Sequence, residues 1–210
     1  MRRYNYTIKN YKFLNSIMTD NIESPDLQWS PQIDSLLAKW CDQAKCFEFM
    51  HEECYSMYNS KSRNFIITMT ILSTISGASN IIAGSYSIYG FQASWIFGGL
   101  GVIASLAHIL QDKLAYQQLS ESNRQYCDIW GSLRRKIEAE IILPYNSRKD
   151  CSSFLELIRN DIDSVSKAGS SIIPKKIREE CLEKFKNISN FNIPDICGIV
   201  EHTTIYTRLI

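Results

Sequence analysis

The sequence predicts an all-α protein in which two long antiparallel helices share an integral membrane hairpin in the middle third of the chain. The first observation is a gap in the charge distribution. Lys, Arg, Asp and Glu make up 21% of the 210 residues, yet none lies among the 48 residues between Arg63 and Asp112. A lipid environment is the simplest explanation for so long an uncharged stretch. The second observation is a pair of matching apolar stripes on either side of this stretch.

Two apolar runs fill the uncharged stretch, Phe65–Ala83 and Phe91–Leu110, and Gly84–Gly90 between them is rich in turn formers. The first run has 19 residues. As a helix it is about 28 Å long, close to the ~30 Å hydrocarbon thickness of a bilayer. Because backbone groups in lipid need internal hydrogen bonds, two isolated runs of this length are expected to be transmembrane helices.

The residues around the two runs predict their orientation. Tyr86, Tyr89 and Trp95 surround the turn, where aromatic rings favour a membrane interface. Basic residues lie at the opposite end of both runs: Lys61, Arg63, Lys113 and Arg124. We therefore expect both termini to be cytoplasmic, and the first run to target the chain, since the basic N-terminus lacks the apolar core of a signal peptide. The alternative is a buried hairpin inside a soluble all-α protein.

Apolar residues recur in alternating steps of four and three on both sides of the hairpin, which is typical of paired helices. The first stripe contains Ile33, Leu37, Trp40, Ala44, Phe47, His51, Cys54 and Tyr58, and the second contains Tyr116, Leu119, Asn123, Tyr126, Trp130, Leu133 and Ile137. Neither segment contains an internal proline, so we expect two continuous helices, 31–83 and 92–143. The polar members, His51 and Asn123, are interpreted either as residues that set the register or as part of a functional site.

The chain is thereby divided into five parts. These are a mobile basic N-terminal arm (1–29), a cytosolic helix (30–63), the hairpin (64–111), a second cytosolic helix (112–143) and a C-terminal region (144–210). Within the last part, 152–165 and 174–188 have the pattern of two short amphipathic helices that dock on the long pair.

The order of these features resembles the SLATT superfamily, a group of two-transmembrane effector domains. The resemblance covers about residues 29–185. It is carried first by a helix with Trp40, Ala44, His51 and Tyr58 that enters a span containing Leu72-Ser73-Thr74-Ile75-Ser76-Gly77. A Gly-rich second span, a helix with Leu119, Tyr126, Leu133 and Ile137, a stretch with Phe154, Ile158 and Ile162, and then Ile173-Pro174 follow. This chain has Gln118 and Asn123 where the family often has a histidine.

The resemblance implies a homo-oligomeric effector that forms a pore or ion channel, gated through its cytosolic helices by a separate sensor or regulatory protein. No glycine-rich phosphate loop is present to suggest a fused nucleotide sensor. The alternative is a structural membrane scaffold or assembly protein, for example of a virus or a membrane-bound particle, without conductance.

Small and polar residues within the two runs are candidates for the pore lining or for an interface between subunits. They are Ser73, Ser76, Asn80, Ser94, Ser105 and His108. Three glycines, Gly77, Gly98 and Gly101, are expected to allow close packing of helices. The alternative is that the same serines and glycines serve only the packing of the two helices within the hairpin, because small residues are common at helix interfaces in lipid.

Several functions are not expected. The seven cysteines form no CxxC pair, so neither a zinc ribbon nor a disulfide framework is predicted, and we expect no metal and no cofactor. The three histidines, His51, His108 and His202, lie in separate parts of the chain, which argues against an enzyme. A net charge of +1 gives no indication of nucleic acid as a partner.

Overall fold

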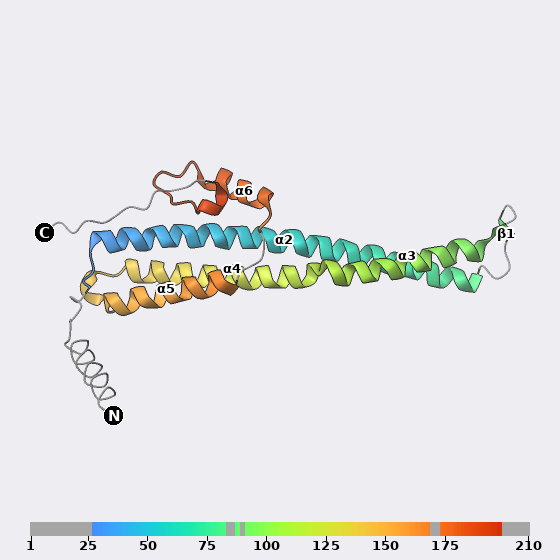
Figure 1. The fold of residues 1–210 in the computed structure, drawn as a ribbon, viewed down its shortest axis with the longest axis horizontal. Coiled ribbons are helices and arrows are strands. Elements are labelled where there is room, and N and C mark those ends of the chain that lie inside the picture. The colour runs from blue at the N-terminus through green and yellow to red at the C-terminus, as the bar shows by residue number, and fades with distance from the viewer. Residues whose placement is uncertain (1–26, 83–86, 89–90, 169–172, 199–210) are drawn as a thin grey trace, which may run out of the picture.

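The computed structural model describes residues 27–82, 87–88, 91–168 and 173–198, without the side-chain surroundings of 78–82, 87–88, 91–97, 111–112 and 167–168. One helix, α2 (Pro31–Ile82), runs the length of the described molecule. α3 (Ala93–Leu114) and α4 (Tyr116–Ile141) return beside it in the opposite direction (Figure 1). The prediction of an all-α fold is confirmed, and its first long helix agrees with α2 to within one residue.

Two shorter helices and four small elements complete the described chain. α5 (Cys151–Ala168) and α6 (Lys175–Phe185) correspond to the two amphipathic segments predicted after the long helices. The 3₁₀ turns η2 (Tyr145–Ser147) and η3 (Asp195–Cys197) follow α4 and α6. β1 (Ser87–Ile88) and β2 (Phe91–Gln92) form a two-residue antiparallel ladder before α3.

The larger core lies where α2, α4 and α5 meet. Phe47 of α2 stacks on Trp130 of α4 with ring centroids 4.6 Å apart. The fully buried side chains of Leu37, Ile137 and Ile158 bring together one residue from each helix. The α2 and α4 residues belong to the two predicted apolar stripes, and Ile158 belongs to the amphipathic segment 152–165. Burial of these predicted apolar faces is what holds the three helices together.

A second core covers another face of α2. Met50 and Cys54 pack there against residues of α6, η3 and the segments that flank them. The contact residues include Ile173, Ile177, Cys181, Phe185, Ile193 and Cys197. α6 therefore lies on the opposite side of α2 from α4 and α5 (Figure 1). All described cysteines are free thiols, and most are buried as small apolar side chains.

The second long helix is not continuous, which corrects the expectation of one helix over 92–143. α3 ends at Leu114, and Ala115 adopts the left-handed conformation with φ 47° and ψ 32° before α4 begins. Alanine is the strongest helix former, so no local signal in the sequence marks this break. A left-handed alanine costs about 1–2 kcal/mol, and the packing of α3 and α4 along α2 must supply it.

Arg148 closes the end of the body where α4 finishes. Its side chain is only 4% exposed and lies against the carboxylate of Asp34. Arg148 also donates to the carbonyls of Ile141 and Leu143 at the end of α4, and its guanidinium lies 4.8 Å from the Trp29 ring centroid. One side chain thus satisfies terminal helix carbonyls and ties the start of α2 to the end of α4.

Replacement of Arg148 by methionine tests this closure. Arg148→Met would remove the guanidinium from the partly buried Asp34 carboxylate, which keeps the Tyr145 hydroxyl as a donor, and would leave two carbonyls without their donor. We expect a loss of about 3 kcal/mol in the free energy of unfolding. Urea titration followed by circular dichroism measures the change. The matched control is Arg159→Met on the exposed surface of α5, where we expect a change within about 0.5 kcal/mol. Equal effects of the two substitutions would contradict the role of Arg148.

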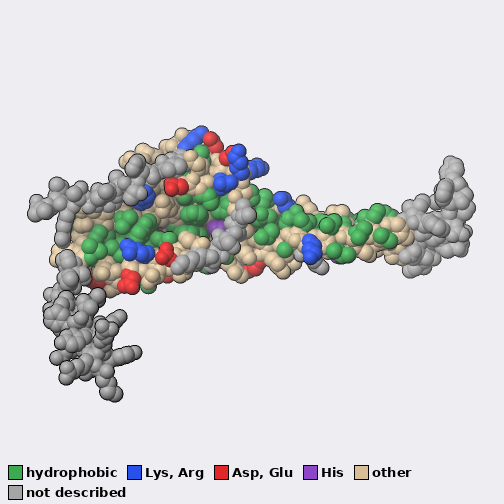
Figure 2. All heavy atoms as spheres, in the orientation of Figure 1, with side chains coloured by type: hydrophobic (Ala, Val, Ile, Leu, Met, Phe, Trp, Pro, Cys, Tyr) green, Lys and Arg blue, Asp and Glu red, His purple; other side chains and the backbone are tan. Residues whose placement is uncertain are grey.

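The molecule divides into a body and an arm. The body contains α4, α5, α6 and the first half of α2, and the arm is the paired segment formed by α2 from residue 64 onward with α3 (Figure 1). Charged side chains gather on the body and at the base of the arm, whereas the rest of the arm shows hydrophobic and uncharged side chains on the face in view (Figure 2). Among the described residues, no helix is identified as both long enough and apolar enough to cross a membrane.

Candidate functional site at the junction of body and arm

A buried polar contact joins α2 to α4 near the base of the arm. His51 Nδ1 lies 2.9 Å from Asn123 Oδ1, and the two residues are 3% and 1% exposed. The Asn123 amide nitrogen donates to the Leu119 carbonyl at 2.7 Å, which fixes Oδ1 as the atom facing His51. His51 must therefore carry a proton on Nδ1 and donate it, so the pair has a defined tautomer.

The surroundings of this pair keep it neutral. Burial lowers the pKa of His51, so the ring is uncharged at neutral pH. The Tyr126 ring lies against it with centroids 5.3 Å apart. One turn further along α2, burial raises the pKa of the Cys54 thiol to about 12. Cys54 therefore stays protonated and has little nucleophilic character. We call the cluster of His51, Asn123, Tyr126 and Cys54 a structural lock, because its contacts hold α2 and α4 together.

Two further contacts extend the lock toward the arm. The Ser120 hydroxyl donates to the Tyr55 carbonyl at 3.4 Å, again from α4 to α2. One turn beyond, the Tyr58 and Tyr116 rings stack with centroids 6.2 Å apart, and Lys61 Nζ lies 5.8 Å from both centroids. Tyr116 is the first residue of α4, so this contact lies directly beside the helix break at Ala115.

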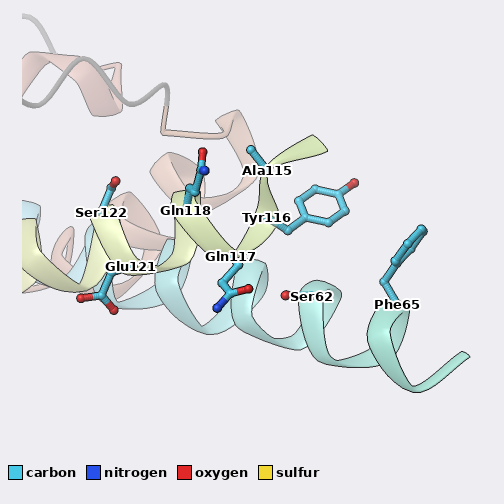
Figure 3. Close-up of a pocket in the computed structure, with 8 residues that line it drawn as sticks. All are labelled: Ser62, Phe65, Ala115, Tyr116, Gln117, Gln118, Glu121 and Ser122. Atoms are coloured by element: carbon cyan, nitrogen blue, oxygen red, sulfur yellow. The ribbon is translucent and has the colours of Figure 1, made fainter. Parts of the chain in front are cut away.

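A cavity of about 710 Å³ lies beside the helix break, between α2 and the start of α4. Its lining combines hydroxyl and amide groups, one carboxylate and apolar groups that include two aromatic rings: Ser62, Phe65, Ala115, Tyr116, Gln117, Gln118, Glu121 and Ser122. Figure 3 shows Gln117 pointing toward α2 near Ser62, whereas the Tyr116 and Phe65 rings extend in the direction in which α2 enters the arm. The α4 N-terminus has no side-chain cap. This volume is in the range of small-molecule sites.

The residues expected to line a pore do not share one face of the arm. Ser76 is buried against α3, whereas Ser73, Ser105 and His108 are exposed on the outside of the hairpin. The side chains of Asn80 and Ser94 lie outside the described part of the structure. Whether these residues line a pore or an interface between subunits stays a prediction.

The three glycines differ in a similar way. A Cβ placed on Gly101 would lie 3.0 Å from the Ser76 hydroxyl oxygen, so α2 and α3 approach closely at this point. At Gly77 and Gly98 an added Cβ would meet nothing within 4 Å among the described atoms. Among the described atoms, Gly101 is thus the glycine of the three that serves packing inside the hairpin, whereas Gly77 and Gly98 are exposed.

Comparison with known proteins adds no family assignment. Neither protein-family models nor curated proteins nor solved structures show a match to this chain. Function must therefore be inferred from the site itself. The sequence pattern marks His51 and Asn123 as polar seam positions, but their direct contact requires the register of the two helices. The cavity at Ala115 has no signal in the sequence.

The burial of His51 makes stability depend on pH, and its hydrogen bond to Asn123 acts against this effect. The pKa of His51 is lowered in the folded protein, so below the ordinary value of about 6.5 the unfolded chain binds a proton that the folded chain resists. This contribution is complete above pH 6.5 and is lost as the pH falls toward the folded pKa, by at most about 1.4 kcal/mol per pH unit.

Urea unfolding of His51→Gln between pH 7.5 and 5.5 measures this dependence. We expect the substitution to abolish most of the loss of stability that the wild type shows over this interval. His108→Gln serves as a control, because His108 is exposed on the arm, and we expect it to keep the slope. A wild-type slope that persists in His51→Gln would contradict the assignment.

Proposed function

We propose that this protein is a self-associating membrane effector whose arm enters a lipid bilayer as a two-helix hairpin, with the body on the cytoplasmic surface. The observation that carries the proposal is the apolar surface of the arm. Ten large aliphatic side chains on it are 41–61% exposed: Ile66, Ile67, Ile71, Ile75, Val102, Ile103, Leu106, Ile109, Leu110 and Leu114. A contiguous apolar surface of this kind marks a membrane or an interaction between proteins.

The hydroxyl groups of the arm support lipid as the surrounding medium. Thr68, Thr70 and Thr74 each donate to the backbone carbonyl four residues earlier, at 2.7–2.9 Å. Ser105 does the same toward Gly101 in α3 at 2.9 Å. These bonds satisfy the hydroxyl protons within each helix, so the groups need no water. Exposed threonines in such numbers are thus compatible with an apolar environment.

Charge at the base of the arm supports the proposed depth of insertion. Lys61 and Arg63 precede the uncharged stretch on α2, and Lys113 and Arg124 follow it on α3 and α4. Basic residues at one end of a hairpin are typical of the cytoplasmic side of a membrane. The aromatic residues Tyr58 and Tyr116 lie at the same level, where amphipathic rings favour the interface.

Self-association follows from the shape of the arm. Two helices cannot enclose water, so a conducting pathway requires several copies around an axis. Gly77 and Gly98 offer small-residue positions on the outer surface, and exposed Ser73 lies one turn from Gly77 on the same helix. Small residues allow close approach of helices from neighbouring copies. Together with the resemblance to the SLATT superfamily, this favours an oligomeric pore.

The continuity of α2 supplies a route for gating. Because α2 is unbroken from Pro31 to Ile82, a movement of its N-terminal part against α4 within the body would be transmitted directly into the arm. The break at Ala115 allows α3 to change its angle to α4 without disturbing the His51–Asn123 contact. A separate sensor that binds the body is the expected source of such a movement.

Flux measurements test the pore. Purified protein in mild detergent is expected to be a homo-oligomer and, after reconstitution, to release ions or a small dye from liposomes. Ser73→Leu places an aliphatic side chain at the exposed hydroxyl position, and we expect release at least about fivefold slower, while the volume-conserving control Ile75→Leu leaves it unchanged. A strictly monomeric protein without flux under any condition would contradict the proposal.

A structural membrane scaffold is the second candidate, and one observation favours it. A groove of about 540 Å³ on the body lies between α4 and α5, lined by Ile129, Leu133 and Val165 with Asp128, Ser132, Lys136, Asp161 and Ser164. Ile129 remains 44% exposed there. Such a groove suits a protein partner. The scaffold predicts localisation that depends on this partner, with Ile129→Lys abolishing it and no conductance.

A further inference from the structure

We propose that the cavity at the helix break binds the phosphate of an anionic phospholipid head group. The inference rests on the proposed membrane insertion, which places the junction of body and arm at the level of the head groups. It assigns a ligand class to a site that the pore itself does not require. The cavity, with its volume of about 710 Å³, is large enough for a head group and the first part of its chains.

The polar half of the cavity carries neutral hydrogen-bonding groups. Ser62 contributes a hydroxyl and Gln117 a side-chain amide, whereas the side chains of Gln118 and Ser122, which also line the cavity, point away from α2 (Figure 3). Gln117 and Ser62 face the space between α4 and α2 from opposite helices (Figure 3). Hydroxyl and amide protons are suitable donors to phosphate oxygens, and donors from two helices can bind different oxygens of one group.

The charges around the cavity favour an anion. The ammonium of Lys61 lies 5.8 Å from the centroid of the Tyr116 ring, and Tyr116 lines the cavity. The one carboxylate in the lining, Glu121, is bound by both Nε and Nη2 of Arg124, at 3.0 and 2.7 Å. Its charge is therefore compensated within α4. Arg124 also pairs with Asp128 at 3.6 Å. Counting Lys61, Arg63, Lys113 and Arg124 against Asp112, Glu121 and Asp128, the base of the arm has a net charge of +1.

The apolar half of the cavity favours a lipid over a soluble phosphate. The Phe65 and Tyr116 rings extend toward the arm (Figure 3). Ile66 and Leu114, the exposed aliphatic residues next in sequence to the cavity lining, are 42% and 41% exposed. A phosphate bound among the polar groups can thus have its glycerol and acyl chains beside these apolar side chains. A free phosphate would make no use of this surface.

Occupancy of the site would stabilise the break at Ala115. The cavity lies beside the point where α3 and α4 fail to join as one straight helix, and Ala115 itself forms part of its lining. A head group in this space selects the broken arrangement over a straightened one, since a ligand favours the state to which it binds better. Lipid composition would then influence the angle of α3 and, through it, the arm.

Lipid binding to the full chain tests this inference. The protein is floated with vesicles of phosphatidylcholine alone, and with vesicles containing phosphatidylglycerol, and binding of short-chain phosphatidylglycerol to the detergent-solubilised protein is titrated by thermal shift. We expect saturable binding that is weakened at least about tenfold by Lys61→Gln and by Gln117→Leu. The exposed control Lys175→Gln on α6 should bind as the wild type does.

The outcomes separate the two proposals. Failure to float with either vesicle overturns membrane insertion and the site together. Flotation with both vesicles, but equal affinity of the wild type, Lys61→Gln and Gln117→Leu for phosphatidylglycerol, overturns the head-group site alone. Equal binding of short-chain phosphatidylcholine overturns the anionic specificity, and full competition by inorganic phosphate assigns the cavity to a soluble anion and overturns the lipid.

Discussion

Each helix of the arm can bury only the face that contacts the other helix, and this constraint governs the rest of the structure. α2 and α3 contact each other through residues such as Met69, Ser76 and Ala104, which are buried, while the aliphatic side chains on their other faces remain exposed. Burial of apolar surface contributes about 25 cal/mol per Å² removed from water, so leaving this surface in water forgoes much of the stabilisation that the sequence could provide. Under the proposed function, contact with lipid and with neighbouring copies of the arm would remove this surface from water.

The body, unlike the arm, has enough helices to cover its apolar faces. α2 is flanked by α4 and α5 on one side and by α6 and η3 on another, and polar contacts fix their register. The His51–Asn123 contact is buried and specific, so a shift of α4 by one turn would leave both groups without a partner. The ion pair between Glu48 of α2 and Arg134 of α4 also fixes this register. Its nitrogen and oxygen lie 2.7 Å apart, and both side chains are 22% exposed. A rigid body joined to the arm by one unbroken helix is suited to transmit movement.

The sequence predicted those features that follow from periodicity. The steps of four and three identified the buried faces of α2 and α4, and the amphipathic segments gave α5 and α6 nearly as they are. Ala115 could not be predicted, because a left-handed alanine depends on how α3 and α4 pack and not on local propensity. The positions of Ser73 and Ser76 on different faces likewise depend on where α3 lies, and the cavity lies beside the break. The role of Arg148 has no pattern in the sequence, because it donates to backbone carbonyls that lie near it only once the turn after α4 has formed.

Glycosylation mapping in microsomes tests most directly whether the arm crosses a bilayer. An acceptor site on a long polar insert is placed in the turn 84–90, while the chain's own Asn-X-Ser/Thr sites at Asn5 and Asn187 report on the two ends. The account predicts that the insert is glycosylated and that Asn5 and Asn187 are not, since both termini stay on the cytoplasmic side. An unmodified insert in a chain that is washed from the microsomes, or modification at Asn187, would contradict it.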